Sequence, residues 1–138
     1  MAGIAAAGAW AAAEPLLRRV FRTPYSDVRL LGAAATRRRG WPIVGLAAHV
    51  ANGAVFGLAF ARLGGGDWKR GVLAAELENL ALWPAMALVD RYHPDRRSGA
   101  WPPLLRNPRV FGYEVATHAI FGAVLGLLAA EADSVARP

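Results

Sequence analysis

Two histidines, His49 and His118, are the side chains of this sequence best placed to carry chemistry in apolar surroundings. Each of them begins the pattern His-x-x-x-Gly-x-x-x-Gly. Because residues four apart share one face of a helix, we expect each imidazole to lie one turn before a pair of glycines. A buried imidazole there could ligate a haem or a transition metal, or relay a proton. The alternative is a pair of structural histidines that bond to the backbone or to polar side chains of neighbouring helices.

Each histidine has one polar neighbour on its own helix face. Asn52 lies three residues after the first histidine, and Glu114 lies four residues before the second. A hydrogen bond between Glu114 and its histidine is the simplest arrangement within that helix. The two neighbours are not equivalent, since the residues that correspond to them in the other helix are Phe121 and Gly45. We therefore expect any site around the histidines to be asymmetric.

A third apolar stretch contains Glu76, Glu78 and Asn79. Residues 76 and 79 share one face of a helix, which we assign to the protein interior within reach of the histidines. Glu78 then points in another direction, toward a neighbouring helix or an oligomer contact. These residues predict one ligand-binding polar cluster, with the two histidines as its candidate metal ligands: His49, Asn52, Glu76, Asn79, Glu114 and His118.

The histidines belong to an internal repeat, in which residues 45–61 align with residues 114–130 without a gap. Alanine-rich sequence raises chance identity, but a histidine, a valine and two glycines also match. The repeat predicts two similar helices, one in each of two tandem units. The identical pairs are Ala47/Ala116, His49/His118, Gly53/Gly122, Ala54/Ala123, Val55/Val124, Gly57/Gly126, Leu58/Leu127 and Ala61/Ala130.

Each repeat helix carries two glycines four residues apart, Gly53 with Gly57 and Gly122 with Gly126. Small residues at this spacing let two helix backbones approach closely in lipid. We therefore predict that these four glycines mediate helix packing, and that the two repeat helices contact each other near a pseudo-two-fold axis. The two imidazoles would then approach each other at that axis.

Four long apolar stretches must position these residues, at about 2–20, 42–61, 68–90 and 110–130. A helix that crosses a membrane needs about 20 mostly apolar residues, and the second stretch has no charged residue. The first stretch is the least apolar, since it contains Glu14, Arg18 and Arg19. The sequence predicts an all-α fold: a four-helix transmembrane bundle forming a single domain, 1–138, from two tandem helical hairpins, about 1–66 and 67–138.

Several residues mark where these helices begin, end or bend. Ser26 is the predicted N-cap of a short amphipathic helix over residues 27–35, which suits the membrane interface. Pro15 predicts a kink or a helix boundary, and the Trp83-Pro84 pair predicts a kink in the third stretch. Residues 64–66 are all glycine and predict a tight turn between the second and third stretches.

Positive charge is concentrated in the connectors between the apolar stretches. The chain has 16 Lys+Arg against 10 Asp+Glu, a formal net charge of +6, and Lys69 is its only lysine. By the positive-inside rule, both long connectors are cytoplasmic and both termini lie outside. Anionic lipids are the expected partners of these loops, and His93 lies either in a lipid-phosphate site or in a solvated basic loop. The connector arginines are Arg18, Arg19, Arg22, Arg29, Arg37, Arg38, Arg39, Arg91, Arg96, Arg97, Arg106 and Arg109.

Composition and motifs exclude several function classes. The chain has no cysteine, which rules out disulfide scaffolds, thiolate metal sites and cysteine nucleophiles. It has no nucleophile elbow, phosphate-binding loop or dinucleotide fingerprint. Nucleic acid is not an expected partner, because the arginine blocks flank apolar helices without an aromatic stacking platform. The first residues lack the positive region of a signal peptide, so we expect a retained helix.

The stretches HVANGAVFG, ALWPAMALVDRYHPDRR and THAIFGAVLG give the chain a resemblance to small uncharacterised bacterial inner-membrane proteins of the YagU-like kind. Those proteins are similar in their repeated His-x-x-x-Gly-x-x-x-Gly helices and in a Trp-Pro helix followed by a proline-rich loop. The resemblance covers the second to fourth stretches. It implies an integral protein of the bacterial inner membrane and carries no established catalytic residues.

Three functions fit these patterns. The first is a non-enzymatic membrane protein whose polar interior binds a proton, a metal ion or a small apolar ligand. The second is a membrane redox protein that binds haem or a transition metal through His49 and His118. The third is a membrane enzyme that acts on a lipid, with Glu76 and His118 in acid–base roles. A soluble alanine-rich bundle is the structural alternative, and homo-oligomerisation remains open.

Overall fold

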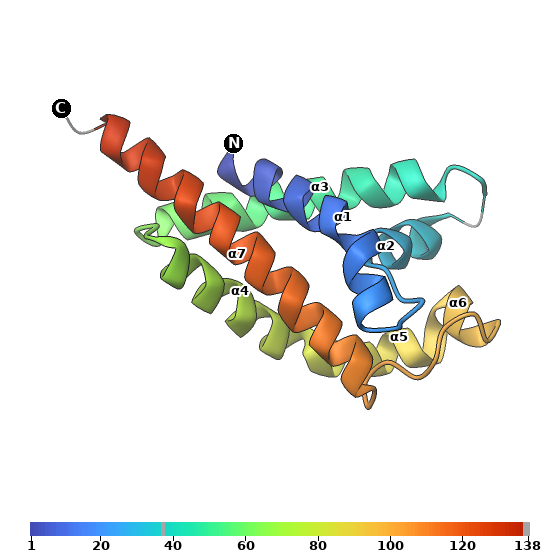
Figure 1. Ribbon diagram of the computed structural model, residues 1–138. Helices are drawn as coiled ribbons and strands as arrows, with labels where there is room; N and C mark the ends of the chain where they lie inside the picture. The colour runs from blue at the N-terminus through green and yellow to red at the C-terminus, as the bar shows by residue number, and fades with distance from the viewer. Residues whose placement is uncertain (37, 137–138) are drawn as a thin grey trace.

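The computed structural model describes residues 1–36 and 38–136, and this part of the chain is helical with no strand (Figure 1). The predicted all-α class is therefore confirmed. Two of the arginines, Arg37 and Arg137, lie outside the described residues. The elements in chain order are α1 (Ala2–Val20), α2 (Asp27–Ala35), α3 (Trp41–Arg62), α4 (Trp68–Leu82), the 3-10 turn η1 (Trp83–Ala85), α5 (Met86–Tyr92), α6 (Pro94–Arg97) and α7 (Pro108–Ala136).

Local signals set several helix boundaries as predicted. The Ser26 hydroxyl caps α2 by accepting a hydrogen bond from the Arg29 backbone N–H at 3.2 Å. The glycines at 64–66 all have positive φ angles, which glycine tolerates best, and they form the turn between α3 and α4. The α-helix gives way to η1 where Pro84 lacks a backbone donor, so the long third stretch is interrupted at the predicted place.

Pro15 does not end α1, which continues to Val20. Of the two alternatives predicted at this proline, a kink or a boundary, the boundary is therefore not found. A proline removes one backbone N–H and crowds one carbonyl of the preceding turn. Trp10 and Glu14, in the turn before it, are buried against other helices. These tertiary contacts hold the helix together across the proline.

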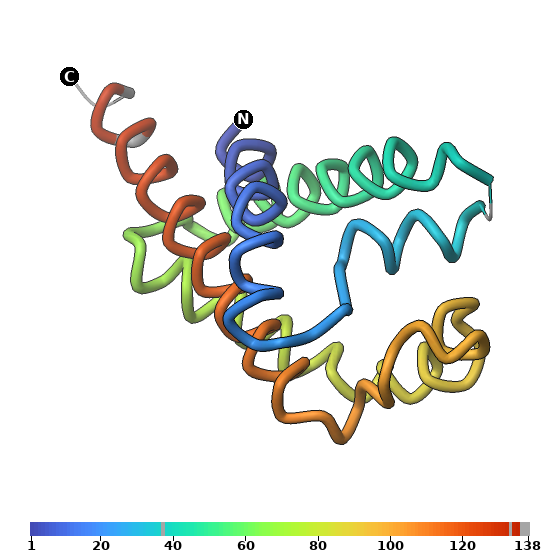
Figure 2. The backbone as a smooth tube through the Cα atoms, turned by 45° about the vertical axis from the view of Figure 1, so that its right-hand side comes forward, coloured from blue at the N-terminus to red at the C-terminus, as the bar shows by residue number. Residues whose placement is uncertain are grey.

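The long helices form two antiparallel pairs, α1 with α3 and α4 with α7, and α1 also packs on α7 (Figure 1). Both termini lie at the end of the molecule where α3 turns into α4, and the two connectors lie toward the opposite end. From that turn α3 and α4 diverge, and α2 lies between them, packed lengthwise on α3 (Figure 2). The divergence leaves space between two of the most apolar helices.

Glycines bring α1 and α3 into close contact. A Cβ atom on Gly53 would lie 2.7 Å from the Gly3 carbonyl oxygen, and one on Gly57 would lie 2.7 Å from the Gly3 Cα atom. Only glycine therefore allows the two backbones to approach this closely. The side chains of Phe121 and Leu125 cover the same glycines from α7, at 3.4 and 3.5 Å from those Cβ positions.

The same arrangement joins α4 and α7. A Cβ atom on Gly122 would lie 2.6 Å from the Val72 Cα atom, and one on Gly126 would lie 2.7 Å from the Trp68 Cα atom. All four repeat glycines thus lie where two helices approach each other closely. The two repeat helices do not meet glycine face to glycine face, because the backbone of α1 packs on the glycines of α3 and that of α4 packs on the glycines of α7. They contact each other instead through Phe121 and Leu125 of α7, which lie on the glycine face of α3.

Two clusters of buried apolar residues hold the fold together. One lies between the long helices, and the other joins the connectors to the start of α7. Both contain aromatic side chains that come from different elements, so each ties together segments far apart in sequence. The first comprises Ala6, Ala7, Trp10, Phe60, Ala75, Phe121 and Leu125. The second comprises Tyr25, Trp101, Leu104, Val110 and Tyr113.

Three helical segments are long and apolar enough to cross a membrane: Trp41–Arg62, Trp68–Tyr92 and Pro108–Ala132. The 19 residues of α1 include three charged ones, and α1 is not among these segments. Many large apolar side chains on α3, α4 and α5 are exposed, as lipid-facing residues are and as the surface of a soluble bundle is not. They include Ile43, Val55, Leu58, Leu73, Leu77, Leu80, Leu82 and Leu88.

Candidate functional site

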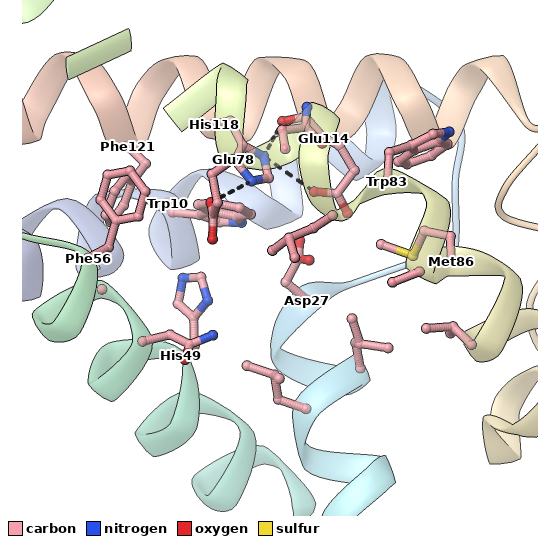
Figure 3. Close-up of a pocket in the computed structure, with 18 residues that line it drawn as sticks. Trp10, Asp27, His49, Phe56, Glu78, Trp83, Met86, Glu114, His118 and Phe121 are labelled. Atoms are coloured by element: carbon pink, nitrogen blue, oxygen red, sulfur yellow. Dashed lines mark hydrogen bonds and ion pairs between the residues drawn. The ribbon is translucent and has the colours of Figure 1, made fainter. Parts of the chain in front are cut away.

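A cavity of about 280 Å³ lies between the diverging helices α3 and α4. Residues of α2, η1 and α5 complete its walls, and α1 and α7 contribute Trp10 and His118 (Figure 3). Glu76 lies outside the cavity, and Asp27 and Glu78 line it instead. Five of the six residues predicted to form a polar cluster do line it: His49, Asn52, Asn79, Glu114 and His118.

Trp10 lies between the two histidines. Its ring centroid is 5.0 Å from that of His49 and 4.5 Å from that of His118, with both pairs edge to face. The expectation that the imidazoles approach each other is therefore wrong, because the indole separates them. Among the described residues, no group of three or more histidine, aspartate or glutamate side chains is arranged to hold a metal ion. The geometry does not bring His49 and His118 together as a pair of ligands.

His118 has a defined tautomer. Its Nδ1 atom lies 2.7 Å from the Glu114 backbone carbonyl oxygen, which can only accept a hydrogen bond, so Nδ1 carries a proton. The Nε2 atom faces the Glu78 carboxylate at 3.5 Å (Figure 3). The two ring nitrogens of His118 therefore face two different acceptors, a main-chain carbonyl oxygen and a carboxylate. The Glu114 carboxylate is 3.4 Å from Nδ1, so the predicted link between these residues exists, but the main chain accepts the hydrogen bond.

Glu78 reaches the histidine and Glu76 does not, although Asn79 and the Glu76 Oε1 atom are buried as predicted. The face of α4 that packs on α7 is centred on Gly71, Ala75 and Asn79, which are buried. At about 100° per residue, position 78 flanks this face on one side and position 76 flanks it on the other. Glu76 instead accepts a hydrogen bond from Asn79 Nδ2 at 3.3 Å.

Two buried carboxyl groups face the cavity, Asp27 from α2 and Glu114 from α7, and they are only 8% and 2% exposed. The Tyr25 hydroxyl donates a hydrogen bond to Asp27 Oδ1 at 2.9 Å. Burial, and then the charge of Asp27, raises the pKa of Tyr25, so the phenol remains a donor. Burial and the nearby Glu14 carboxylate raise the pKa of Asp27.

Glu14 of α1 links this helix to the start of α2 through hydrogen bonds. Its Oε2 atom accepts a hydrogen bond from the Ser26 hydroxyl at 2.7 Å, and its Oε1 atom accepts one from the Asp27 backbone N–H at 2.8 Å. The carboxylate thus sits at the N-terminus of α2, where the helix dipole favours negative charge. The sequence carried a signal for this role, since Trp10 and Glu14 are four residues apart and share one face of α1.

Four buried polar atoms on cavity-lining residues have no hydrogen-bond partner among the described residues. An unpaired buried polar atom costs roughly 1–3 kcal/mol, so such atoms are uncommon in folded proteins. Two are donors or acceptors on rings, and two are carboxylate oxygens. These four are half of the eight such atoms in the described residues, and their shared position around one cavity indicates a place that accepts a polar group. They are Trp10 Nε1, His49 Nε2, Asp27 Oδ2 and Glu114 Oε1.

His93 is a structural residue of the connectors. Its side chain is buried, and its ring stacks on Trp101 at 4.6 Å between centroids. Nδ1 accepts a hydrogen bond from the Asp95 backbone N–H, so Nε2 is the atom that donates to the Leu30 carbonyl oxygen at 3.2 Å. Burial lowers the pKa of His93, in keeping with this neutral form. His93 is therefore neither solvated nor placed to bind lipid phosphate, contrary to both expectations.

Ion pairs tie the basic connectors to each other and to α5. Arg29 of α2 donates two hydrogen bonds to the Asp95 carboxylate, at 2.9 and 2.6 Å. Arg96 donates to Asp90 at 2.8 Å, and Asp90 also accepts from the backbone N–H of Leu104. Some connector arginines therefore stabilise the fold through ion pairs, in addition to any contact they make with a membrane surface.

Comparison of the chain with protein-family models, with curated proteins and with solved structures gave no match. The fold and the cavity define its class by themselves. The described residues are all-α, with three helices long and apolar enough to cross a membrane, and a cavity with polar groups lies between two of them.

Proposed function

We propose that this chain is an integral membrane protein that binds a lipophilic molecule, through a polar group of that molecule, in the cavity between α3 and α4. The observation that carries the proposal is the set of unpartnered buried atoms on Trp10, His49, Asp27 and Glu114 in an otherwise apolar cavity. A ligand group that hydrogen-bonds to these atoms would recover the free energy lost by leaving them unpaired.

The walls of the cavity support a lipophilic ligand. They consist mainly of apolar side chains, among them Leu30, Phe56, Met86 and Val89. Leu82 also lines the cavity and is 56% exposed, so this side opens between two candidate membrane helices. A molecule dissolved in the bilayer would reach the polar groups through that opening without crossing water.

The proposed architecture has four membrane-crossing helices in two hairpins, α1 with α3 and α4 with α7. Two features support the fourth crossing and the repeat. The Glu14 carboxylate accepts hydrogen bonds inside the protein, and the other charged residues of α1 lie only in its last turn. Each hairpin also uses one glycine of its first helix, Gly3 or Gly71, against the glycine pair of its second. The basic connectors are cytoplasmic and face anionic lipids in this proposal.

The absence of cysteine allows each side of the membrane to be labelled through a single introduced thiol. Ser98 in the second connector and Ser134 near the end of α7 are both exposed. In spheroplasts, a membrane-impermeant maleimide is expected to label Ser134→Cys and Ala5→Cys but not Ser98→Cys, which reacts only after permeabilisation. Ser26→Cys is the buried control, expected to react only after unfolding. Labelling of Ser98→Cys from outside would reverse the orientation, and loss of Ala5→Cys labelling would reject the crossing by α1.

Binding in the cavity can be followed with pyrene, a neutral apolar probe that accepts excitation energy from tryptophan. Trp10 and Trp83 both line the cavity, so purified protein in detergent is expected to transfer energy to bound pyrene. Asn52→Phe places an aromatic ring at the cavity wall and should weaken pyrene binding at least about tenfold, or about 1.4 kcal/mol.

The matched control is Val55→Phe, which puts the same ring on the outer side of α3, where Val55 is 69% exposed. This variant should bind pyrene like the unmodified chain. Equal loss in both variants, or equal transfer in Asn52→Phe and the unmodified chain, would reject the proposed site.

A further inference from the structure

We propose that the polar group of the ligand is positively charged, so that the cavity between α3 and α4 selects lipophilic organic cations. This inference rests on the proposed function and names the ligand class of the same cavity. It follows from the charge of the lining, from the unpartnered carboxylate oxygens and from the aromatic rings beside them.

The lining residues carry acidic groups on three separate elements, Asp27 on α2, Glu78 on α4 and Glu114 on α7. Among the described residues that line the cavity there is no lysine or arginine. The nearest arginine on α2, Arg29, is bound to Asp95 of the connector. The other titratable groups facing these carboxylates are Glu14, His49, His118 and the hydroxyls of Tyr25 and Tyr113.

Two carboxylate oxygens are unpartnered within the described part of the chain. Asp27 Oδ2 and Glu114 Oε1 belong to side chains that are more than nine-tenths buried and that line the cavity. A carboxylate oxygen only accepts hydrogen bonds when ionised, and its strongest partners are positively charged donors. Because burial and Glu14 raise the pKa of Asp27, a bound cation must also bring this group into its ionised form, which a positive charge beside it favours. Once ionised, the two oxygens favour a cation over an anion or an uncharged apolar molecule.

Aromatic rings give the cavity a second means of attracting a cation. Trp10, Phe56, Trp83 and Phe121 all line it. The faces of such rings attract organic cations, and the attraction strengthens when water is excluded. Because no group of three or more acidic or histidine side chains in the described residues is arranged around a metal ion, an inorganic ion fits less well than an organic one.

Competition against pyrene tests the inference with two molecules of the same shape. Phenyltrimethylammonium carries a permanent charge, and tert-butylbenzene is its uncharged carbon isostere. The cation is expected to displace pyrene at a concentration at least about tenfold lower than the isostere, after correction for partition into micelles. The Glu78 carboxylate faces the His118 ring and its side chain is 39% exposed, so Glu78→Gln should fold normally.

Glu78→Gln is expected to weaken displacement by the cation about tenfold and to leave displacement by tert-butylbenzene unchanged. Glu76→Gln removes the same charge from the same helix outside the cavity and should change neither. If both molecules displace pyrene equally, or if Glu78→Gln and Glu76→Gln behave alike, the inference is overturned while the proposed site stands. If pyrene itself does not bind, both proposals fail.

Discussion

Gly122→Leu is expected to separate α4 from α7 and to lower the free energy of unfolding by about 2–3 kcal/mol or more. The position is enclosed by backbone: a Cβ atom there would collide with the Gly71 carbonyl and lie 2.6 Å from the Val72 Cα atom. Backbone of a packed helix cannot move aside as a flexible side chain can. Overpacking of this kind typically costs about 1–3 kcal/mol, and leucine adds three further carbons.

Leucine forms helices better than glycine, and this preference offsets part of the packing penalty but not all of it. Replacing a glycine in a helix interior stabilises the helix by roughly 0.5–1 kcal/mol, which is smaller than the packing penalty. Gly8→Leu isolates the helix-propensity contribution, because a Cβ atom on Gly8 meets nothing within 4 Å. Thermal unfolding of the detergent-solubilised protein should show a lower Tm for Gly122→Leu and an equal or higher Tm for Gly8→Leu. Similar values for both variants would show that α4 and α7 do not pack through this glycine.

The contrast between these two glycines shows what periodicity along a sequence can predict. Gly53, Gly57, Gly122 and Gly126 were predictable as packing residues, because their spacing alone places them on one face of a helix. Spacing does not state which helix covers that face. The glycines of α3 and α7 proved to face α1 and α4, and only the tertiary arrangement contains that information.

The polar site likewise contains some residues that the sequence identified and others whose place depends on the tertiary arrangement. Its histidines, Asn79 and Glu114 were identified because polar residues in apolar helices need an interior environment. The choice between Glu76 and Glu78 depends on the rotation of α4 against α7, which its hydrophobic pattern leaves undetermined because most of its surface is apolar. His93 was misjudged for a related reason. Its partners Leu30 and Trp101 lie outside its own segment, and the charged residues around it suggest an exposed loop.

Trp10 was missed because a single tryptophan in an alanine-rich stretch has no periodic pattern. The structure gives it a central place, in contact with His49, His118 and Phe121 from two other helices. It is 7% exposed, so its bulk fills space that α1, α3 and α7 share. Alanine-rich helices offer few other large side chains for this purpose, which concentrates the packing of three helices on one residue.

Trp10→Ala is accordingly expected to lower the free energy of unfolding by about 3–5 kcal/mol, the range for loss of a buried aromatic side chain. In a membrane the loss comes mainly from packing contacts, since lipid and the protein interior are both apolar. Trp68→Ala is the control, because Trp68 is 48% exposed at the start of α4 and its loss should change stability by less than about 0.5 kcal/mol. Steric-trapping or thermal measurements in the same detergent compare the two.

Trp10→Phe separates packing from hydrogen bonding at this position. Phenylalanine keeps a ring between the two histidines and removes only the Nε1 donor, which has no partner among the described residues. Most of the stability lost in Trp10→Ala should therefore return in Trp10→Phe. Binding of a ligand that accepts a hydrogen bond from Nε1 would weaken in Trp10→Phe, whereas phenyltrimethylammonium, which offers no acceptor, would bind with little change. If Trp10→Phe is as unstable as Trp10→Ala, the indole N–H has a structural partner and the cavity is smaller than proposed.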